Sequence, residues 1–369
     1  MNIVVQTCVS IICTAPSASL FEVTTVMSKE ESVNRRKYVR TVGGAVVGLA
    51  AGTAIGYMIP REAAVKPSRK VLLIFSYSPD HPWVIEETKG VSEVLWDKGL
   101  VIEEFYMDTK RHTSSEWIDK VTGEALDKIK QFMPDVVIVF DDNATNFVAK
   151  KFEGQTLPFV FCGVNRKPKE YGLPVSNITG VVEIHHYVEC VNLLKRIVPN
   201  VRKVAMVMDD GATSQGFLEY IKETSLPVEV TEYYTTNDFD AWKAKINELQ
   251  SKVDAIGLFT YHTVKQGEAE ESLPPEQVLG WTLDNNTLPE FTFFDFTIKS
   301  GALCGVTLPG SEQGRAAAEM AHKILNGTKP GDIPIMTPEK TIPMVNIKRA
   351  QQLKLNVPGN VLEEVEVVY

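Results

Sequence analysis

An apolar stretch from Val136 to Phe140, followed directly by Asp141, Asp142 and Asn143, constrains the fold of this chain most strongly. Its consecutive β-branched and aromatic residues are typical of a strand buried on both faces, as in a parallel sheet covered by helices on each side. In open parallel α/β sheets, ligands bind in the crevice beyond the carboxyl ends of the strands. We therefore expect the three polar residues to lie where a small molecule is bound.

Apolar runs alternate with helix-spaced amphipathic stretches from residue 70 onward. The run at 204–208 repeats the first pattern, because it also ends in two aspartates, Asp209 and Asp210. At 369 residues the chain exceeds the size at which one hydrophobic core usually stops growing. We therefore expect an α/β protein with two domains, the second of which starts with this run. Strands are expected at 71–75, 100–105, 136–140, 158–161, 178–182, 204–208, 228–234, 255–262, 289–296 and 301–306.

Charge is distributed unevenly along the chain. Residues 1–70 contain nine Lys and Arg against four Asp and Glu, whereas the remainder contains 29 basic and 43 acidic residues. Affinity for nucleic acid comes from a basic surface, so the acidic body argues against a nucleic-acid partner. The excess of Lys and Arg in residues 1–70 indicates that this segment has a role other than that of the acidic body.

Residues 1–69 are interpreted as a leader and linker. Arg35 and Arg36 precede the uncharged stretch 41–59, an arrangement that resembles a twin-arginine signal peptide. The nineteen residues of that stretch give roughly 28 Å of helix, enough to cross the apolar part of a bilayer. The leader is expected either to be cleaved or to keep membrane contact through 41–59, and translation to begin at Met1 or Met27. In both cases the body is exported to the periplasm or cell surface.

No sequence motif indicates a cofactor, a metal site or a catalytic centre. Both glycine-rich phosphate loops are absent, as are G-x-S-x-G and C-x-x-C. His185 and His186 are adjacent, which is not a chelating spacing on a helix. Cys162, Cys190 and Cys304 are expected to be small buried side chains, and export leaves a disulfide between two of them open.

A series of short motifs, occurring in one order, resembles a single family. The motifs are Ser76-Tyr77 with Pro82-Trp83, 106–111, 141–144, 161–165, 179–183, 312–315, and the ending from 324–327 through 330–334 to Asn346. From about residue 70 to 369 the chain is similar to ABC-transporter substrate-binding proteins of the type 1 periplasmic-binding fold. It is particularly similar to variants that also occur as extracellular sensory domains.

The resemblance implies two Rossmann-like three-layer lobes, with a hinge of three crossovers near 180–184, 288–292 and 326–336. Lobe 1 is expected to comprise 70–181 plus 291–327, and lobe 2 to comprise 182–290 plus 328–369. A ligand binds between the lobes, which close around it. Ligand contacts carried over by position are Tyr77, Trp83, Asp142, Asn143, Asn165, Glu183, Asp210, Tyr261 and Asp295. Asp142 and Asn143 are preferred over Asp141 as the ligand clamp.

Three functions are weighed on these grounds. The first is an extracytoplasmic solute-binding protein, which captures a small organic ligand such as an amino acid or another aromatic molecule and delivers it to an ABC permease in the membrane. The second is a sensory module for a separate membrane signalling partner such as a sensor kinase. An enzyme based on Asp141 and Asp142 is disfavoured, because neighbouring residues on a strand point to opposite faces.

Overall fold

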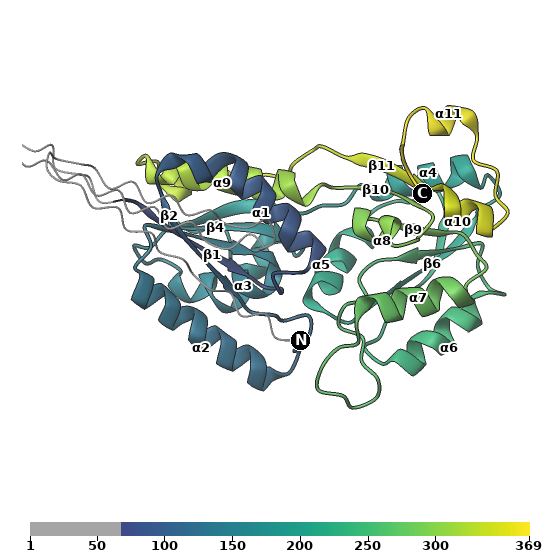
Figure 1. Cartoon of the computed structure of the whole chain (residues 1–369), viewed down its shortest axis with the longest axis horizontal. Helices are drawn as coiled ribbons and strands as arrows, with labels where there is room; N and C mark the ends of the chain where they lie inside the picture. The colour runs from purple at the N-terminus through teal and green to yellow at the C-terminus, as the bar shows by residue number, and fades with distance from the viewer. Residues whose placement is uncertain (1–67) are drawn as a thin grey trace, which may run out of the picture. The chain divides into compact units, whose positions relative to one another are not determined.

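The computed structural model describes residues 68–369 (Figure 1). The expected export signal at Arg35 and Arg36, the stretch 41–59 and the two alternative starts lie outside the described residues. Within 68–369, no helix is long and apolar enough to cross a membrane.

The first lobe is built on a five-stranded parallel sheet with the order β2-β1-β3-β4-β5. The strands are β1 Lys70–Phe75, β2 Val101–Tyr106, β3 Val136–Phe140, β4 Phe159–Val164 and β5 Ile178–Val182. All five residues of β3 are buried, as expected for the central strand of a sheet with helices on both faces. The carboxyl ends of these strands all meet at one edge, which faces the second lobe.

The helices of the first lobe cover its sheet on both faces, which explains the continuous apolar strands. Val71, Leu73 and Phe75 pack in the core with α1 and α9, while Leu72 and Ile74 pack in the core with α2. Figure 1 shows α1 and α9 lying together on one side of the sheet and α2 on the other. The helices and helical turns of this lobe are α1 Pro82–Leu95, η1 Trp96–Lys98, α2 Ser115–Phe132, α3 Asp141–Phe147, η2 Ala149–Phe152, η3 Pro168–Tyr171 and α9 Gly310–Leu325.

The second lobe contains a seven-stranded sheet with the order β12-β11-β10-β9-β8-β6-β7, in which β10 and β11 pair antiparallel. Its strands are β6 Lys203–Met208, β7 Glu229–Thr235, β8 Ala255–Leu258, β9 Glu290–Thr292, β10 Cys304–Thr307, β11 Ile342–Asn346 and β12 Glu366–Val368. Its helices are α4 Tyr187–Ile197, α5 Ala212–Ile221, α6 Phe239–Leu249, α7 Pro275–Asn285, α8 Asp295–Lys299, α10 Ile347–Gln352 and α11 Gly359–Leu362. One face packs on α4 and α5, and the other on α6 and α7.

Two of the expected boundaries are corrected by the strand pairing. Residues 291–307 were assigned to the first lobe, but β9 and β10 pair with each other, and β9 pairs with β8 in the second sheet. The second crossover therefore lies between β10 and α9, at 308–309, and not at 288–292. The expected strand 289–296 is likewise shorter, because α8 begins at Asp295.

The other two crossovers lie close to their expected positions. The chain leaves the first sheet after β5. After α9, segment 330–336 runs beside β5 before the chain enters β11 in the second sheet. Along that segment, the Thr179 hydroxyl donates to the carbonyl of Ile333 at 2.7 Å, and the N–H of Val182 donates to the carbonyl of Met336 at 2.8 Å. This final segment, 330–336, contains the helical turn η4 Pro330–Asp332.

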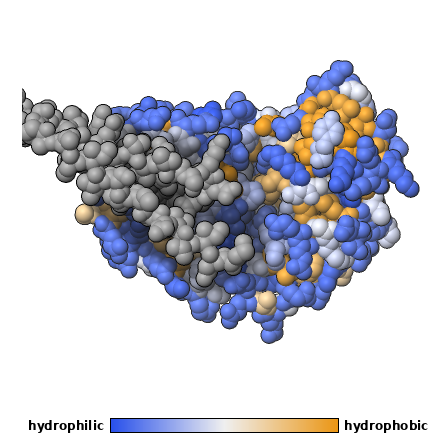
Figure 2. Space-filling model, viewed as in Figure 1, coloured by the Kyte–Doolittle hydropathy of each residue, from blue (hydrophilic) through white to orange (hydrophobic). Residues whose placement is uncertain are grey.

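The C-terminal tail packs on the second lobe through Val345, Ala350 and Val361, which are part of its core. The buried guanidinium of Arg349 forms an ion pair with buried Glu290 at the start of β9. Figure 2 shows hydrophobic residues gathered on the surface near α10 and α11, where Leu362 is exposed. The tail is thus an integral layer of this lobe.

The three cysteines of the described region, Cys162, Cys190 and Cys304, are buried and free. Asn143 lies inside α3. That helix begins at Asp141, whose φ of 65° is left-handed. Aspartate tolerates this conformation better than most residues, because its short polar side chain can hydrogen-bond locally.

Candidate functional site

The two lobes contact each other across the edge where their strands end. Thr213, in the first turn of α5, forms hydrogen bonds through its hydroxyl with two residues of the first lobe. Its hydroxyl lies 2.8 Å from the hydroxyl of Tyr77 and 3.2 Å from the Lys110 ammonium, which donates to it. Side chains of the two lobes are therefore in direct contact and line a shared interior.

Two further hydrogen bonds join the lobes, one on each side of Thr213. On one side, the Ser272 hydroxyl donates to the Lys110 carbonyl at 2.8 Å. On the other, the carboxylate of Glu219 accepts from the backbone N–H of Lys167 at 3.0 Å. Close by, Gly216 approaches the backbone at 165–166 so closely that a Cβ built on it would stand 2.6 Å from the nitrogen of Arg166. Gly216 therefore permits the closest approach of α5 to the first lobe.

A small inner pocket lies between these contacts. Its volume of about 20 Å³ accommodates one group of the size of a water molecule. Its walls come from both lobes and combine aromatic rings with polar groups. They are Tyr77, His81, Trp83, Lys110, Asp141, Asn165 and Glu183 from the first lobe and the crossover after it, and Thr213, Thr260, His262, Phe294 and Phe296 from the second.

Five polar side chains of this pocket have a buried atom without a hydrogen-bond partner: His81 through Nε2, His262 through Nδ1, and two carboxyls and an amide of the first-lobe wall. In that wall, Asp141 Oδ2, Glu183 Oε1 and both amide atoms of Asn165 have none. Each of these three side chains belongs to a residue no more than 2% exposed. Since leaving buried polar atoms unpaired costs free energy, such atoms usually have a partner. Here the arrangement of two carboxylates beside an amide fits a ligand group that carries positive charge and donates several hydrogen bonds.

The electrostatics of the first-lobe wall favour the same kind of group. Burial raises the pKa of Asp141 well above its usual range, and the neighbouring carboxylates of Glu183 and Asp142 raise it further. Burial also raises the pKa of Glu183 to about 8, against the opposing influence of the Asn165 amide and of the Lys110 ammonium. The positive charge near both carboxyls thus does not offset their burial, and a cation beside them would stabilise their ionised forms.

The carboxylate of Asp209, which lies behind the second-lobe wall, is already satisfied internally. It accepts hydrogen bonds from the N–H groups of His262 and Thr263 at 2.9 and 3.2 Å, and from the hydroxyls of Ser214 and Thr260, both at 2.8 Å. Burial alone would raise its pKa, but the Lys110 charge and the hydroxyl groups outweigh it and hold the pKa below its usual value. Burial lowers the pKa of His262 to about 3, so this ring is neutral at physiological pH.

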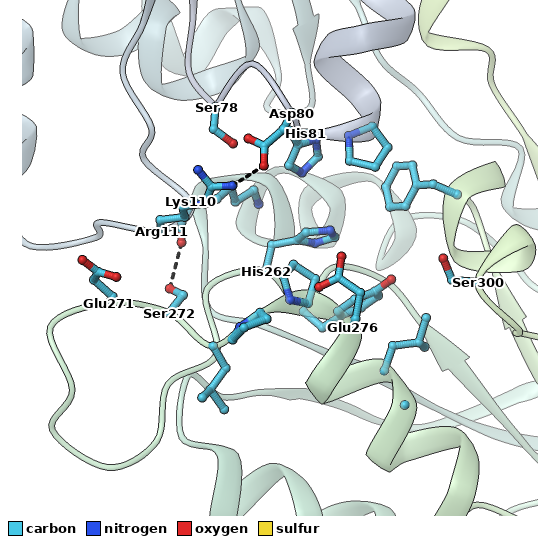
Figure 3. Close-up of a pocket in the computed structure, with 18 residues that line it drawn as sticks. Ser78, Asp80, His81, Lys110, Arg111, His262, Glu271, Ser272, Glu276 and Ser300 are labelled. Carbon is cyan, nitrogen blue, oxygen red and sulfur yellow. Dashed lines mark hydrogen bonds and ion pairs between the residues drawn. The ribbon is translucent and has the colours of Figure 1, made fainter. Parts of the chain in front are cut away.

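An outer cavity of about 500 Å³ continues from the inner pocket and shares His81, Lys110, His262 and Phe296 with it. Figure 3 shows His81 and His262 facing each other across it, and their ring centroids are 4.9 Å apart. His81 is placed by α1, because its Nδ1 accepts the Trp83 N–H at 3.2 Å as the helix cap. The two rings therefore mark the boundary between a narrow polar chamber and a wider one.

The residues suggested by the sequence are distributed over three cavities. Tyr77, Trp83, Asn165 and Glu183 line the inner pocket, and Tyr261 lines the outer cavity. Asn143 and Asp210 line a third cavity, of about 260 Å³, on the other side of Tyr77 and Thr213. The carboxylate of Asp295 pairs with Lys299 at 2.5 Å. Neither Asp142 nor Asp295 lines any of these three cavities.

The preference for Asp142 over Asp141 is not supported by the geometry. Asp142 accepts hydrogen bonds from the Tyr171 hydroxyl at 2.7 Å and from the backbone N–H groups of Asn165 and Arg166 at 3.2 and 3.1 Å. Its carboxylate is therefore used inside the first lobe, where it holds the loop that carries Asn165. Asp141 is the one whose side chain reaches the pocket.

Sequence reasoning did not select several pocket residues. They are His81, Lys110, Thr213, Thr260, His262, Phe294 and Phe296, and Asp141 was ranked below Asp142 and Asn143. Of these, His81 and Lys110 lie within loops that the sequence had already placed beyond strands 71–75 and 100–105, so strand-end position was an available signal. Thr213 and Phe296 carry no comparable signal, because they reach the pocket only when the two lobes meet. In the described part of the chain, no group of three or more His, Cys, Asp and Glu could hold a metal ion.

Comparison with known proteins places these observations in context. The family model described as ABC transporter substrate binding protein matches residues 77–368. A curated relative from Clostridioides difficile (strain R20291), a tyrosine-binding protein, is 21% identical over 282 residues, which cover 72% of this chain and 76% of the relative.

Solved structures are similar at the level of the fold. A domain from Streptococcus pneumonia in complex with L-Trp aligns with a TM-score of 0.63 at 20% identity, covering 82% of this chain and all of that one. The ligand-free, open form of a substrate-binding protein with adhesive properties from Clostridium difficile aligns with a TM-score of 0.58 at 17% identity, covering 81% and 99%. The expected type 1 periplasmic-binding fold, with two α/β lobes, is confirmed.

Proposed function

Because the chain belongs to the ABC transporter substrate-binding protein family, we propose that it captures an amino acid, most favourably an aromatic one, between its lobes outside the cytoplasm and delivers it to an ABC permease. Closure of the lobes around the ligand retains it during transfer. The ligand leaves chemically unchanged, so the protein acts as a carrier and not as an enzyme.

The observation that carries this proposal is the set of unpaired, buried polar atoms in the inner pocket. Asp141, Asn165 and Glu183 offer acceptors for an ammonium group, whose size matches the volume of about 20 Å³. Lys110 lies in the same pocket and provides positive charge for the ligand carboxylate. An α-amino acid carries both groups on adjacent atoms.

The aromatic rings around the pocket support a ligand with an aromatic side chain. Trp83 and Phe294 stand edge to face with their centroids 6.0 Å apart, and Phe296 stacks on Phe294 at 5.1 Å. Beyond them, the outer cavity of about 500 Å³ offers room for a side chain that the inner pocket cannot hold. Apolar walls with a few placed polar groups are typical of small-molecule sites. Two relatives are described as binding L-Trp and tyrosine, which agrees with this ligand class.

A calorimetric comparison of matched ligands tests the proposal. L-tryptophan and L-tyrosine are expected to bind, indole-3-propionate, which lacks the ammonium group, to bind at least about 100-fold more weakly, and tryptamine, which lacks the carboxylate, to be weakened as well. Equal affinity for L-tryptophan and indole-3-propionate would show that the carboxylates do not recognise an ammonium group. No binding of any of the twenty amino acids would refute the ligand class.

Transport and turnover are tested separately. Native mass spectrometry of protein incubated with L-tryptophan should recover the unaltered amino acid, whereas a modified product would indicate an enzyme. Genes for a permease and an ATPase beside the gene for this chain support transport, while a sensor-kinase gene there would support the sensory alternative.

A further inference from the structure

Glu87 is a buried carboxyl that lines neither the inner nor the outer cavity. It lies on α1, one turn after Trp83, and its residue is fully inaccessible to solvent. Oε1 accepts a weak hydrogen bond from the Cys162 thiol at 3.7 Å, and Oε2 has no partner. A carboxylate held in this way has no compensating positive charge in contact with it.

Glu87 nevertheless stands directly behind the pocket. A Cβ built on Gly163 would be 2.7 Å from Glu87 Oε1, 3.1 Å from Asp141 Oδ1 and 3.4 Å from Trp83 Nε1. These side chains therefore converge on the glycine, whose φ of 64° belongs to the left-handed region. Gly163 is the spacer that lets Glu87 approach Asp141 from the side away from the ligand.

The charges around this group are predominantly negative. From α3, Asp141 acts on it, with Asp142 acting in turn on Asp141, and Glu183 acts from the end of β5. The Cys162 thiol on β4 and the Tyr77 hydroxyl after β1 are neutral, since burial raises the pKa of both. From the second lobe, Thr213 adds only a hydroxyl and His262 a neutral ring.

The positive charges nearby are few and already engaged. The Lys110 ammonium acts on Asp141 and Glu183, but it donates to Thr213 and lies 5.1 Å from the centre of the Tyr77 ring. The His185 ring lies 3.2 Å from Glu183 Oε1 without hydrogen-bond geometry, and burial lowers its pKa to about 3. The Lys110 ammonium is thus shared by the buried carboxyls of Asp141, Glu183 and Asp209, and a further negative charge on Glu87 would be costly.

Resting on the proposed function, we infer that Glu87, Asp141 and Glu183 form a proton-holding cluster that links ligand binding to pH. Glu87 keeps its proton at neutral pH and stands behind Asp141 as a neutral group. The Asp141 and Glu183 pair holds a second proton in the ligand-free protein. When the ligand ammonium enters the pocket, it supplies the missing positive charge, and this second proton leaves to solvent as both carboxylates ionise.

The direction of the pH effect follows from this exchange. Since binding releases a proton, ligand affinity is expected to rise with pH while the pair still holds that proton. Its slope reaches up to about tenfold per pH unit, the limit for one linked proton. The rise ends near pH 8, where the carboxyl of Glu183 ionises without help from the ligand.

Infrared spectroscopy of the ligand-free protein tests the role of Glu87. At pH 7 a band of a protonated, buried carboxyl is expected, and it should lose the Glu87 component in Glu87→Gln but remain unchanged in Glu86→Gln. Glu86 is the matched control, because it neighbours Glu87 on α1 but is partly exposed and faces Lys89. A spectrum that Glu87→Gln leaves unchanged would overturn the inference.

Calorimetry with L-tryptophan in buffers of different ionisation enthalpy tests proton release. About one proton per bound ligand is expected at pH 6.5, both in the wild type and in Glu87→Gln, whose affinity should stay within about threefold because glutamine copies a neutral carboxyl. Glu183→Gln should abolish the release. A loss of affinity above tenfold in Glu87→Gln, or binding without proton release, would overturn the inference. If neither L-tryptophan nor L-tyrosine binds, the proposed function and the release step both fail, while the infrared band still decides the state of Glu87.

Discussion

In each lobe a buried strand, β3 or β6, is followed by two aspartates, and the two lobes use the pair differently. In the first lobe, Asp141 reaches the pocket with an unpaired oxygen, and Asp142 is bonded inside the lobe. In the second lobe the order is reversed: Asp209 is bonded inside the lobe, and Asp210 accepts from Gln215 at the surface. The same sequence pattern therefore serves folding in both lobes and, under the proposed function, ligand recognition in one.

The internal role is the same in both lobes and shows why one aspartate of each pair is needed. Asp142 binds the N–H groups of Asn165 and Arg166, in the loop after the neighbouring strand β4. Asp209 does so for His262 and Thr263, after the neighbouring strand β8. Each carboxylate thus ties together two adjacent strand ends, and its partner in the pair is free for another use.

The largest expected effect concerns the bonded aspartate of the second lobe. Asp209→Ala should lower the free energy of unfolding by about 3–5 kcal/mol, because it leaves several buried donors unpaired beside the Lys110 charge. Urea denaturation measures the change. Asp210→Ala is the matched control and should cost less than about 0.5 kcal/mol, as usual for a surface position. Equal losses of unfolding free energy in both variants would mean that Asp209 stabilises the fold no more than Asp210 does.

The unpaired aspartate of the first lobe should show the opposite profile. Asp141→Asn is expected to weaken L-tryptophan binding by about 100-fold, since it removes a charged acceptor of the ammonium group. Stability should not fall, because the substitution removes one of three crowded carboxyls. Calorimetry and urea denaturation of the same preparation measure both quantities, with the exposed Asp119→Asn as control. Reduced stability with unchanged affinity would assign Asp141 a structural role.

The pH dependence of stability should also separate the lobes. The folded pKa of Glu183, about 8, lies above its ordinary value of 4.5, so the folded protein binds more protons between these values and loses stability as pH rises. From pH 6.5 to 8 the loss amounts to up to about 2 kcal/mol for one proton. The depressed pKa of Asp209 adds stability that is lost only as pH falls below the ordinary carboxyl range. Denaturation at several pH values should therefore show a decline above pH 6.5 that is absent in Glu183→Gln, and a persistent decline in that variant would place its source elsewhere.

The smallest of these effects concerns the contact between the lobes. Gly216→Ala should weaken ligand binding by about tenfold, because the added methyl group would collide with the backbone at 165–166 and hold the lobes apart. Stability should hardly change, since the collision exists only in the closed form. Gly123→Ala on α2 is the control, as a Cβ there meets no atom within 4 Å. Small-angle scattering with ligand measures closure, and an unchanged compact form in Gly216→Ala would contradict the expected collision.

The sequence predicted most strands and their alternation with helices because burial on both faces leaves a continuous apolar run. The same property made the assignment of β9 and β10 to a lobe wrong, since a run such as Phe291–Thr292 reads alike in either sheet. The position of a crossover depends on which strand each apolar run pairs with. The spacing of apolar residues within a run does not specify that pairing. The family resemblance supplied Tyr77, Asn165 and Glu183 as candidate site residues, and their role as ligand contacts stays a prediction.

For this protein, the sequence by itself determined two α/β lobes and the edge at which polar residues collect, because both follow from local hydrophobic patterns. The tertiary structure decided which aspartate faces the pocket, since that depends on the left-handed backbone at Asp141 and on the donors that capture Asp142. It also brought Thr213, His262 and Phe296 to the first lobe. A site between two lobes is made by contacts between distant segments, and a single strand with its neighbours in sequence cannot specify them.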